Sequence, residues 1–164
     1  MDRYLKLAVA ILGSWYFLWC AAYPANWHFI DNVNLFVHEG GHIIFWPFGD
    51  FLHVLGGSLT QVALPLLFVI YFYYQDQKYS AALTLFWVGE NMVNVSVYAG
   101  DSIKMQLPLL FGDNSIHDWN WLLIYTGQLH HTTIIAGTIY WIGVITMVLA
   151  AAGSIYFSLQ SDEQ

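Results

Sequence analysis

Residues 34–45 read NLFVHEGGHIIF, and this stretch places three polar side chains inside an otherwise apolar run. The three side chains are those of His38, Glu39 and His42. In an α-helix, residues four apart share a face, so the two imidazoles would lie one above the other. A charged group at bilayer depth costs about 2.5–3.5 kcal/mol on insertion scales, so such a cluster indicates a functional site.

The composition around this stretch is that of a membrane protein. Of the 164 residues, 58% are hydrophobic and only 9% are charged, whereas a soluble domain averages about 25% charged residues. We therefore expect an all-α, polytopic bundle of membrane helices. The length predicts a single integral membrane domain over residues 1–164.

About five hydrophobic segments are expected, since roughly 20 apolar residues suffice to cross a bilayer. They cover about Tyr4–Tyr23, Trp27–Trp46, Val54–Tyr74, Tyr79–Ala99 and Thr132–Leu159, with a shorter apolar stretch at Trp119–Leu129. The second segment, which holds the opening motif, can be re-entrant instead of spanning. The first begins like a signal peptide, but its apolar stretch exceeds the usual 7–15 residues or so, which favours a retained helix.

Charge and cysteine content exclude several functions. The net charge is −7, and the basic residues Arg3, Lys6, Lys78 and Lys104 are scattered, which argues against nucleic-acid binding. Cys20 is the sole cysteine, so neither an internal disulfide nor a thiolate metal cluster is possible. If all five segments crossed, Arg3, Lys6 and Lys104 would share one side of the membrane and Lys78 would lie opposite.

The sequence His38-Glu39-Gly40-Gly41-His42 is an H-E-x-x-H motif. Both imidazoles can bind one metal ion, and Glu39 then lies where it can act as general base on water. The alternative is a chance match in which the two histidines are structural. Zinc in catalytic sites usually takes three protein ligands and leaves a fourth position open, so one more ligand is needed.

Several polar residues are candidates for the third ligand or for substrate binding. Asp101, Glu90 and His117 can each supply a ligand atom. His117 with the adjacent Asp118 can instead stabilise a transition state, or be a solvated pair. Asn91 and Asn94 share a helix face and can bind a substrate backbone, or form hydrogen bonds between helices.

HEGGH resembles the H-E-x-G-H motif of the site-2 protease family of intramembrane zinc metalloproteases. GSLTQ at residues 57–61 is similar to a later G-P-x-x-N stretch of that family, with Ser for Pro and Gln for Asn. NVSVYAGD at residues 94–101 resembles a third region, in which an Asn precedes the Asp that completes the zinc site. The match lacks the family's prolines and has Ser102 where the family has Gly. The resemblance implies that Asp101 is the third ligand.

These observations lead to a functional expectation. The resemblance implies a membrane-embedded, zinc-dependent metalloprotease that hydrolyses peptide bonds of membrane or membrane-proximal substrates, with its metal-binding core at about residues 27–118. The alternatives are a metallohydrolase of a lipid or another amide, and a non-catalytic metal-binding or transport protein. Expected partners are membrane lipid and a membrane protein or peptide substrate. The expected location is a bacterial-type cell membrane, crossed several times.

Overall fold

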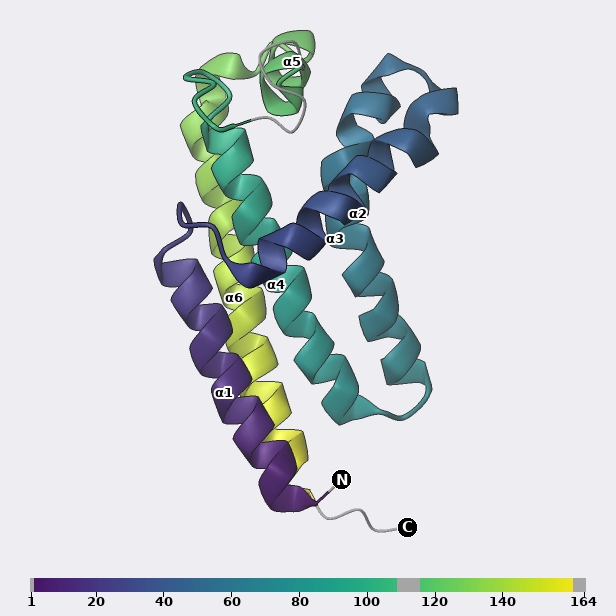
Figure 1. Ribbon diagram of the computed structural model, residues 1–164, viewed down its shortest axis with the longest axis vertical. Helices are drawn as coiled ribbons and strands as arrows, with labels where there is room; N and C mark the ends of the chain where they lie inside the picture. Colours follow the sequence, from purple (N-terminus) through teal and green to yellow (C-terminus); the bar gives the residue numbers. More distant parts are fainter. Residues whose placement is uncertain (1, 109–115, 161–164) are drawn as a thin grey trace.

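The computed structural model describes residues 2–108 and 116–160, and within these ranges all regular structure is helical (Figure 1). The α-helices are α1 (Arg3–Ala22), α2 (Phe29–Phe45), α3 (Asp50–Tyr74), α4 (Lys78–Gly100), α5 (Asp118–Tyr125) and α6 (Thr132–Leu159). Two short 3₁₀ turns, η1 (Trp46–Phe48) and η3 (Leu129–His131), precede α3 and α6. The expected all-α class is confirmed.

Within the described ranges, three helical segments are long and apolar enough to cross a membrane: Arg3–Ala22, Asp50–Tyr74 and Leu129–Leu159. The prediction of about five such segments is therefore not confirmed. Helix α2 has 17 residues, which corresponds to about 26 Å, and its polar residues lower its hydropathy. Helix α4 is longer, but it buries Glu90 and Asn91 near its middle.

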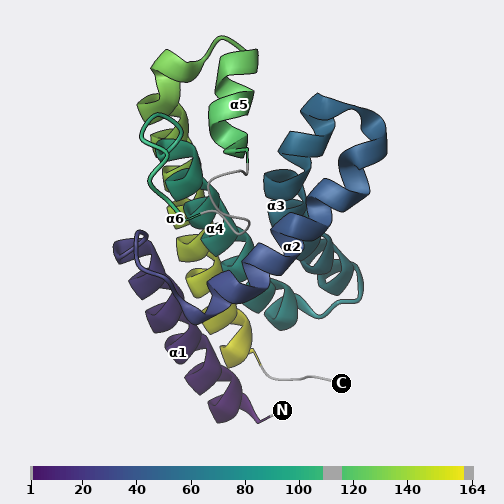
Figure 2. The ribbon, with the colours of Figure 1, turned by 45° about the horizontal axis from the view of Figure 1, so that its top comes forward.

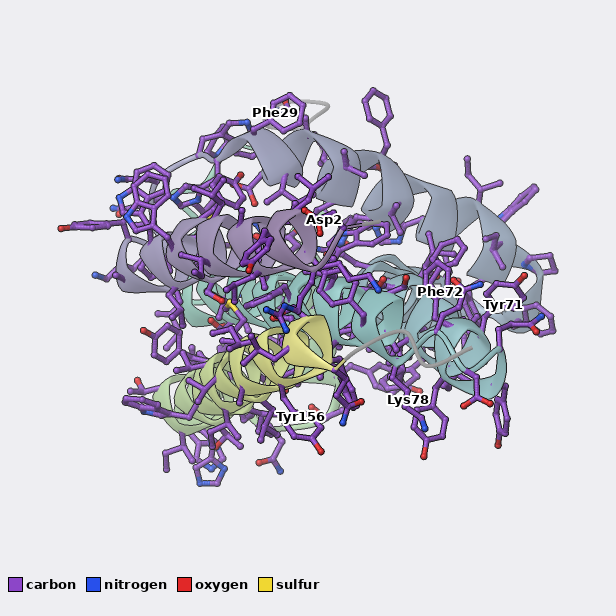
Figure 3. All side chains as sticks on the ribbon, turned by 90° about the horizontal axis from the view of Figure 1, so that it is seen from below. Asp2, Phe29, Tyr71, Phe72, Lys78 and Tyr156 are labelled. Atoms are coloured by element: carbon purple, nitrogen blue, oxygen red, sulfur yellow. The ribbon has the colours of Figure 1, made fainter. Side chains whose placement is uncertain are left out.

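Helix α4 lies at the centre of the molecule (Figure 1). It packs most extensively against α6 and also against α3, while α1 lies along α6 and α2 packs on α3. The exposed surface of these helices is rich in large apolar side chains. Phe29, for example, is 81% exposed and points away from the bundle (Figure 3). Such a surface is suited to contact with lipid.

The start of α4 lies at the same end of the bundle as the start of α1. The hydroxyl of Tyr79 donates a hydrogen bond of 2.6 Å to the carbonyl oxygen of Lys6, so Lys78 and Lys6 are close to the same end. This differs from the expectation that Lys78 lies opposite. Helix α2 begins near the middle of the bundle and does not run its whole length (Figures 1 and 2), so it does not reverse the direction of the chain as a spanning helix would.

Close contact between α2 and α3 depends on two glycines. A β-carbon built on Gly41 would overlap the carbonyl oxygen of Gly56, and one built on Gly56 would lie 2.8 Å from the carbonyl oxygen of Gly41. Small residues of this kind allow helix backbones to approach closely in membranes. The HEGGH segment of α2 is thereby held directly against the first half of α3.

Candidate metal centre

The two histidines of the HEGGH motif meet the carboxylate of Asp118. Nε2 of His38 lies 3.0 Å from Oδ2 of Asp118, and Nε2 of His42 lies 3.2 Å from the same oxygen. One ligand atom from each of the three residues falls within 4.8 Å of the others. His38 and Asp118 are buried and His42 is half-buried. Among the described residues, this group of three could hold a metal ion.

The second ring nitrogen of each histidine faces a carbonyl oxygen. Nδ1 of His38 lies 3.0 Å from Oε1 of Gln61, and Nδ1 of His42 lies 2.8 Å from the backbone oxygen of His53. A carbonyl oxygen only accepts, so each Nδ1 carries the hydrogen and donates it. When the imidazoles are neutral, their Nε2 lone pairs face the Asp118 carboxylate. A positive charge between these groups would satisfy all three, either as a proton on an imidazole or as a bound metal ion.

Gly57 on α3 leaves the space that such a charge needs. A β-carbon at this position would lie 2.6 Å from Nε2 of His38 and 2.6 Å from Nε2 of His42. Any residue other than glycine would thus place its β-carbon against both ring nitrogens. The donor set of two imidazoles and one carboxylate is one that zinc accepts in catalytic sites. The residues present therefore fit a metal ion that takes nitrogen and oxygen ligands.

Helix α5 carries Asp118 into this position. The indole Nε1–H of Trp119 donates to Oγ of Ser58 on α3 at 3.1 Å, and the backbone N–H of Asp118 donates to the Tyr98 hydroxyl on α4 at 3.1 Å. The start of α5 is thus fixed to both neighbouring helices. Burial raises the pKa of the Asp118 carboxyl, but contacts with His38 and His42 outweigh it and hold that pKa below its ordinary value.

Asp101, expected to be the third ligand, is not brought to the histidine pair. Its carboxylate accepts hydrogen bonds from the backbone N–H groups of Gln106 and Leu107, at 3.0 and 2.9 Å, and lies 3.3 Å from Nε2 of His117. Partial burial raises the pKa of Asp101, but these hydrogen bonds hold it below its ordinary value. Asp101 follows directly after α4 and stabilises the turn that comes next. The structure places Asp118, instead of Asp101, beside His38 and His42.

Both ring nitrogens of His117 form hydrogen bonds within the protein. It is the N-cap of α5, and its Nδ1 accepts a hydrogen bond from the backbone N–H of Asn120 at 3.2 Å. Nε2 therefore carries the hydrogen and donates it to Asp101. Both ring nitrogens are used, which leaves none for a metal. His117 positions the start of α5, and with it the adjacent Asp118.

Glu90 and Asn91 lie in the helix interfaces. Glu90 is 2% exposed and accepts a hydrogen bond of 2.6 Å from the side-chain amide of Asn34, while the Asn34 oxygen accepts from Nε1 of Trp87 at 2.8 Å. The Asn91 amide donates to the backbone oxygen of Trp87 in its own helix at 2.8 Å. Neither residue belongs to the group of three around His38. Asn94 does contact that group indirectly, through Gln61.

A pocket of about 300 Å³ reaches the motif between α2 and α4. Its polar lining consists of Asn26, Asp31, His38, Glu39, Gln61, Asn94 and Tyr98, and its apolar lining of Pro24, Ala25, Trp27, Leu35, Val97, Leu107 and Pro108. Glu39 is half-buried and lies outside the group of three possible ligands. The ring of Tyr98 packs edge-on against that of His38, with centroids 5.8 Å apart.

Sequence reasoning gave Asp118, Tyr98 and His53 no site role of their own. In the sequence, Asp118 stands out only as the neighbour of His117, because a carboxylate that follows a polar segment is most often solvated. Asp118 and His38 lie within hydrogen-bonding distance although they are 80 positions apart in the sequence. No local pattern predicts such a contact. Gln61 did carry a signal, since it falls in the GSLTQ stretch noted above.

Comparisons with protein-family models, with curated proteins and with solved structures return no match for this chain.

Proposed function

We propose that this protein is a multi-pass membrane zinc metalloprotease in which His38, His42 and Asp118 hold the ion. One observation carries the proposal: both Nδ1 atoms face carbonyl oxygens while both Nε2 atoms converge on one buried carboxylate oxygen. Zinc, when bound, supplies a Lewis acid that polarises a carbonyl and brings the pKa of water towards neutrality. The resemblance to the site-2 protease family supports the same reaction.

Glu39 would act as the general base and then as the general acid of the hydrolysis. It is the neighbour of His38, lines the pocket and is not part of the ligand group. As general base it takes a proton from the attacking water while the new C–O bond forms. It then returns the proton to the amide nitrogen as the C–N bond breaks. A carboxylate that stays outside the ligand set favours hydrolysis over a closed binding or transport site.

Tyr98 is the best-placed donor for the developing oxyanion. Its oxygen accepts from the backbone N–H of Asp118, and its own hydroxyl hydrogen has no acceptor within the described part of the chain. Asn94, expected to bind a substrate backbone, and His117, expected to stabilise a transition state, instead donate hydrogen bonds to Asp31 and Asp101. A hydroxyl that is fixed through its oxygen and free to donate suits oxyanion stabilisation.

The pocket suggests the kind of substrate. Trp27, Leu35 and Val97 provide apolar walls beside His38 and Glu39. The lining also contains the carboxylates of Asp31 and Glu39 and none of the four basic residues, which disfavours an acidic side chain. From the apolar walls we infer that an apolar side chain of a membrane-proximal peptide occupies it.

The ligand assignment is tested by measuring zinc per chain in purified variants. We expect about one zinc in the wild type and in Asp101→Asn, and a strong loss in Asp118→Asn, because Asp118 supplies a ligand oxygen. Asp101→Asn is the matched control, since it makes the same chemical change one loop away. Loss of zinc in Asp101→Asn with retention in Asp118→Asn would refute the assignment. A wild type that binds no zinc would refute the site.

The reaction is tested with protein in liposomes and a quenched fluorescent peptide that has a Leu/Ala membrane segment. Glu39→Gln should keep its zinc and lose about 10²–10⁴-fold in turnover, the usual contribution of general acid–base catalysis. Removal of zinc by a chelator should abolish cleavage, and added zinc should restore it. Cleavage that survives in Glu39→Gln would exclude Glu39 as the base.

A further inference from the structure

A chain of three side-chain hydrogen bonds joins His38 to a distant carboxylate. Nδ1 of His38 lies 3.0 Å from Oε1 of Gln61. Nε2 of Gln61 in turn donates to Oδ1 of Asn94 at 2.8 Å. Nδ2 of Asn94 then donates to Oδ1 of Asp31 at 2.9 Å. The chain leaves α2, crosses α3 and α4, and returns to α2 two turns before His38.

The direction of the two amide hydrogen bonds in this chain is set at its carboxylate end, Asp31. The amides of Gln61 and Asn94 are similar in shape when flipped, so each can present oxygen or nitrogen to either neighbour. A carboxylate only accepts. The second oxygen of Asp31 also accepts, from the backbone N–H of His28 at 2.6 Å. Asp31 thus requires the amine of Asn94, which directs the oxygen of Asn94 at Gln61.

The same reasoning extends to the metal centre. With its amine turned to Asn94, Gln61 presents its oxygen to His38. Nδ1 of His38 must then carry the hydrogen, which makes Nε2 the nitrogen that can bind a metal ion. We propose that Asp31 is a positioning residue that sets the tautomer of His38, through Asn94 and Gln61, for metal binding; this rests on the zinc site proposed above. Partners of this kind typically change metal affinity by about 10–100-fold when removed.

His42 provides a comparison within the same site. Its Nδ1 donates to the backbone oxygen of His53, and a backbone carbonyl cannot be flipped. Its tautomer is therefore independent of Asp31. The two histidines have equivalent roles at the centre, but only His38 depends on a remote carboxylate for its orientation.

The decisive experiment reverses the direction of these hydrogen bonds while keeping the shapes of the side chains. In Asp31→Asn the chain can reverse, because residue 31 can then donate to Asn94. Gln61 would present its amine to His38, and Nδ1 would lose its hydrogen. The double variant Asp31→Asn/Gln61→Glu should restore the wild-type tautomer, since a carboxylate at position 61 again accepts from Nδ1. Asn94, flipped, can then donate to Glu at 61 and accept from Asn at 31.

Two readouts are measured on the full chain in detergent. The zinc Kd should rise about 10–100-fold in Asp31→Asn and return toward the wild-type value in the double variant. In metal-free protein, ¹⁵N spectra of labelled histidine should show Nδ1 of His38 protonated in the wild type and bare in Asp31→Asn. Asp50→Asn, an exposed change in the first turn of α3, should match the wild type in both.

The outcomes separate this role from others. Asp31 also caps its own helix through His28, and a purely structural role would give a loss of zinc that Gln61→Glu does not repair. That result, or an unchanged His38 tautomer in Asp31→Asn, would overturn the proposal. If the wild type binds no zinc, the proposed function fails, and the spectra of metal-free protein still decide the role of Asp31.

Discussion

A β-carbon built on Gly57 would lie 2.6 Å from Nε2 of both His38 and His42, whereas one built on Gly40 meets no described atom within 4 Å. Both glycines adjoin the candidate centre, so they form a matched pair. Gly57→Ala should introduce strain of about 1–3 kcal/mol, which corresponds to roughly 5- to 150-fold in the zinc Kd. Gly40→Ala should bind zinc as the wild type does.

The measurement is zinc affinity by competition with a chelating dye, alongside circular dichroism to compare helix content. Equal zinc affinity in the two variants would mean that the ion does not lie between the histidines and Gly57. The effect of a glycine-to-alanine change thus depends on the face of the helix that the glycine occupies. Gly40 and Gly41 are neighbours in sequence, but only Gly41 contacts α3.

At the scale of helices, α4 and α6 approach each other through a second pair of glycines. A β-carbon on Gly143 would lie 2.7 Å from the carbonyl oxygen of Gly89, and one on Gly89 would lie 2.6 Å from Cγ of Met147. The buried side chains of Phe86, Val93 and Met147 surround this crossing. It anchors α4, on which Tyr98 and Asn94 depend for their positions.

We expect Gly143→Ala to destabilise the bundle by about 1–3 kcal/mol, because the methyl group would push the two helices apart. Gly137→Ala is the control on the same helix, since a β-carbon there meets no described atom within 4 Å. It should be neutral or slightly stabilising, as alanine favours helix over glycine by about 1 kcal/mol in soluble hosts. Thermal unfolding in detergent measures both. An equal Tm for the two variants would contradict this packing.

For the whole molecule, the direction of the helices predicts an orientation in the membrane. The start of α1 and the start of α4 lie at one end of the bundle, and the end of α4 lies at the other (Figure 1). Arg3, Lys6 and Lys78 belong to the first end, and Lys104 follows the end of α4. Basic residues favour the cytoplasmic side. The N-terminus and the turn between α3 and α4 should therefore be cytoplasmic, and the metal centre should lie toward the opposite surface.

Single cysteines in a Cys20→Ala background test this orientation. Gln77 and Ile103 are both exposed, at opposite ends of α4. A membrane-impermeant maleimide added to intact cells should label Ile103→Cys, and it should label Gln77→Cys only after permeabilisation. The Cys20→Ala parent should stay unlabelled. Labelling of both positions from outside would mean that the two ends of α4 lie on the same side of the membrane, and the reverse pattern would contradict the orientation.

The sequence by itself determined the helical class, the apolar exterior and the pair of histidines with Glu39. These follow from composition and from spacing within one helix, where residues four apart share a face whatever the rest of the chain does. It also indicated Asn94 as a candidate for substrate binding, and it placed Gln61 in a stretch similar to one of the site-2 protease family. Their exact partners were left open, because an amide can be satisfied in many ways.

Only the tertiary structure decided the third member of the candidate centre. Asp101 and Asp118 are both carboxylates after α4, and local sequence does not distinguish them as ligands. Asp101 is used by the backbone of the turn that follows it, while α5 folds back between α3 and α4 and brings Asp118 to His38. Such a contact depends on how helices distant in sequence pack, and packing is a property of the whole chain.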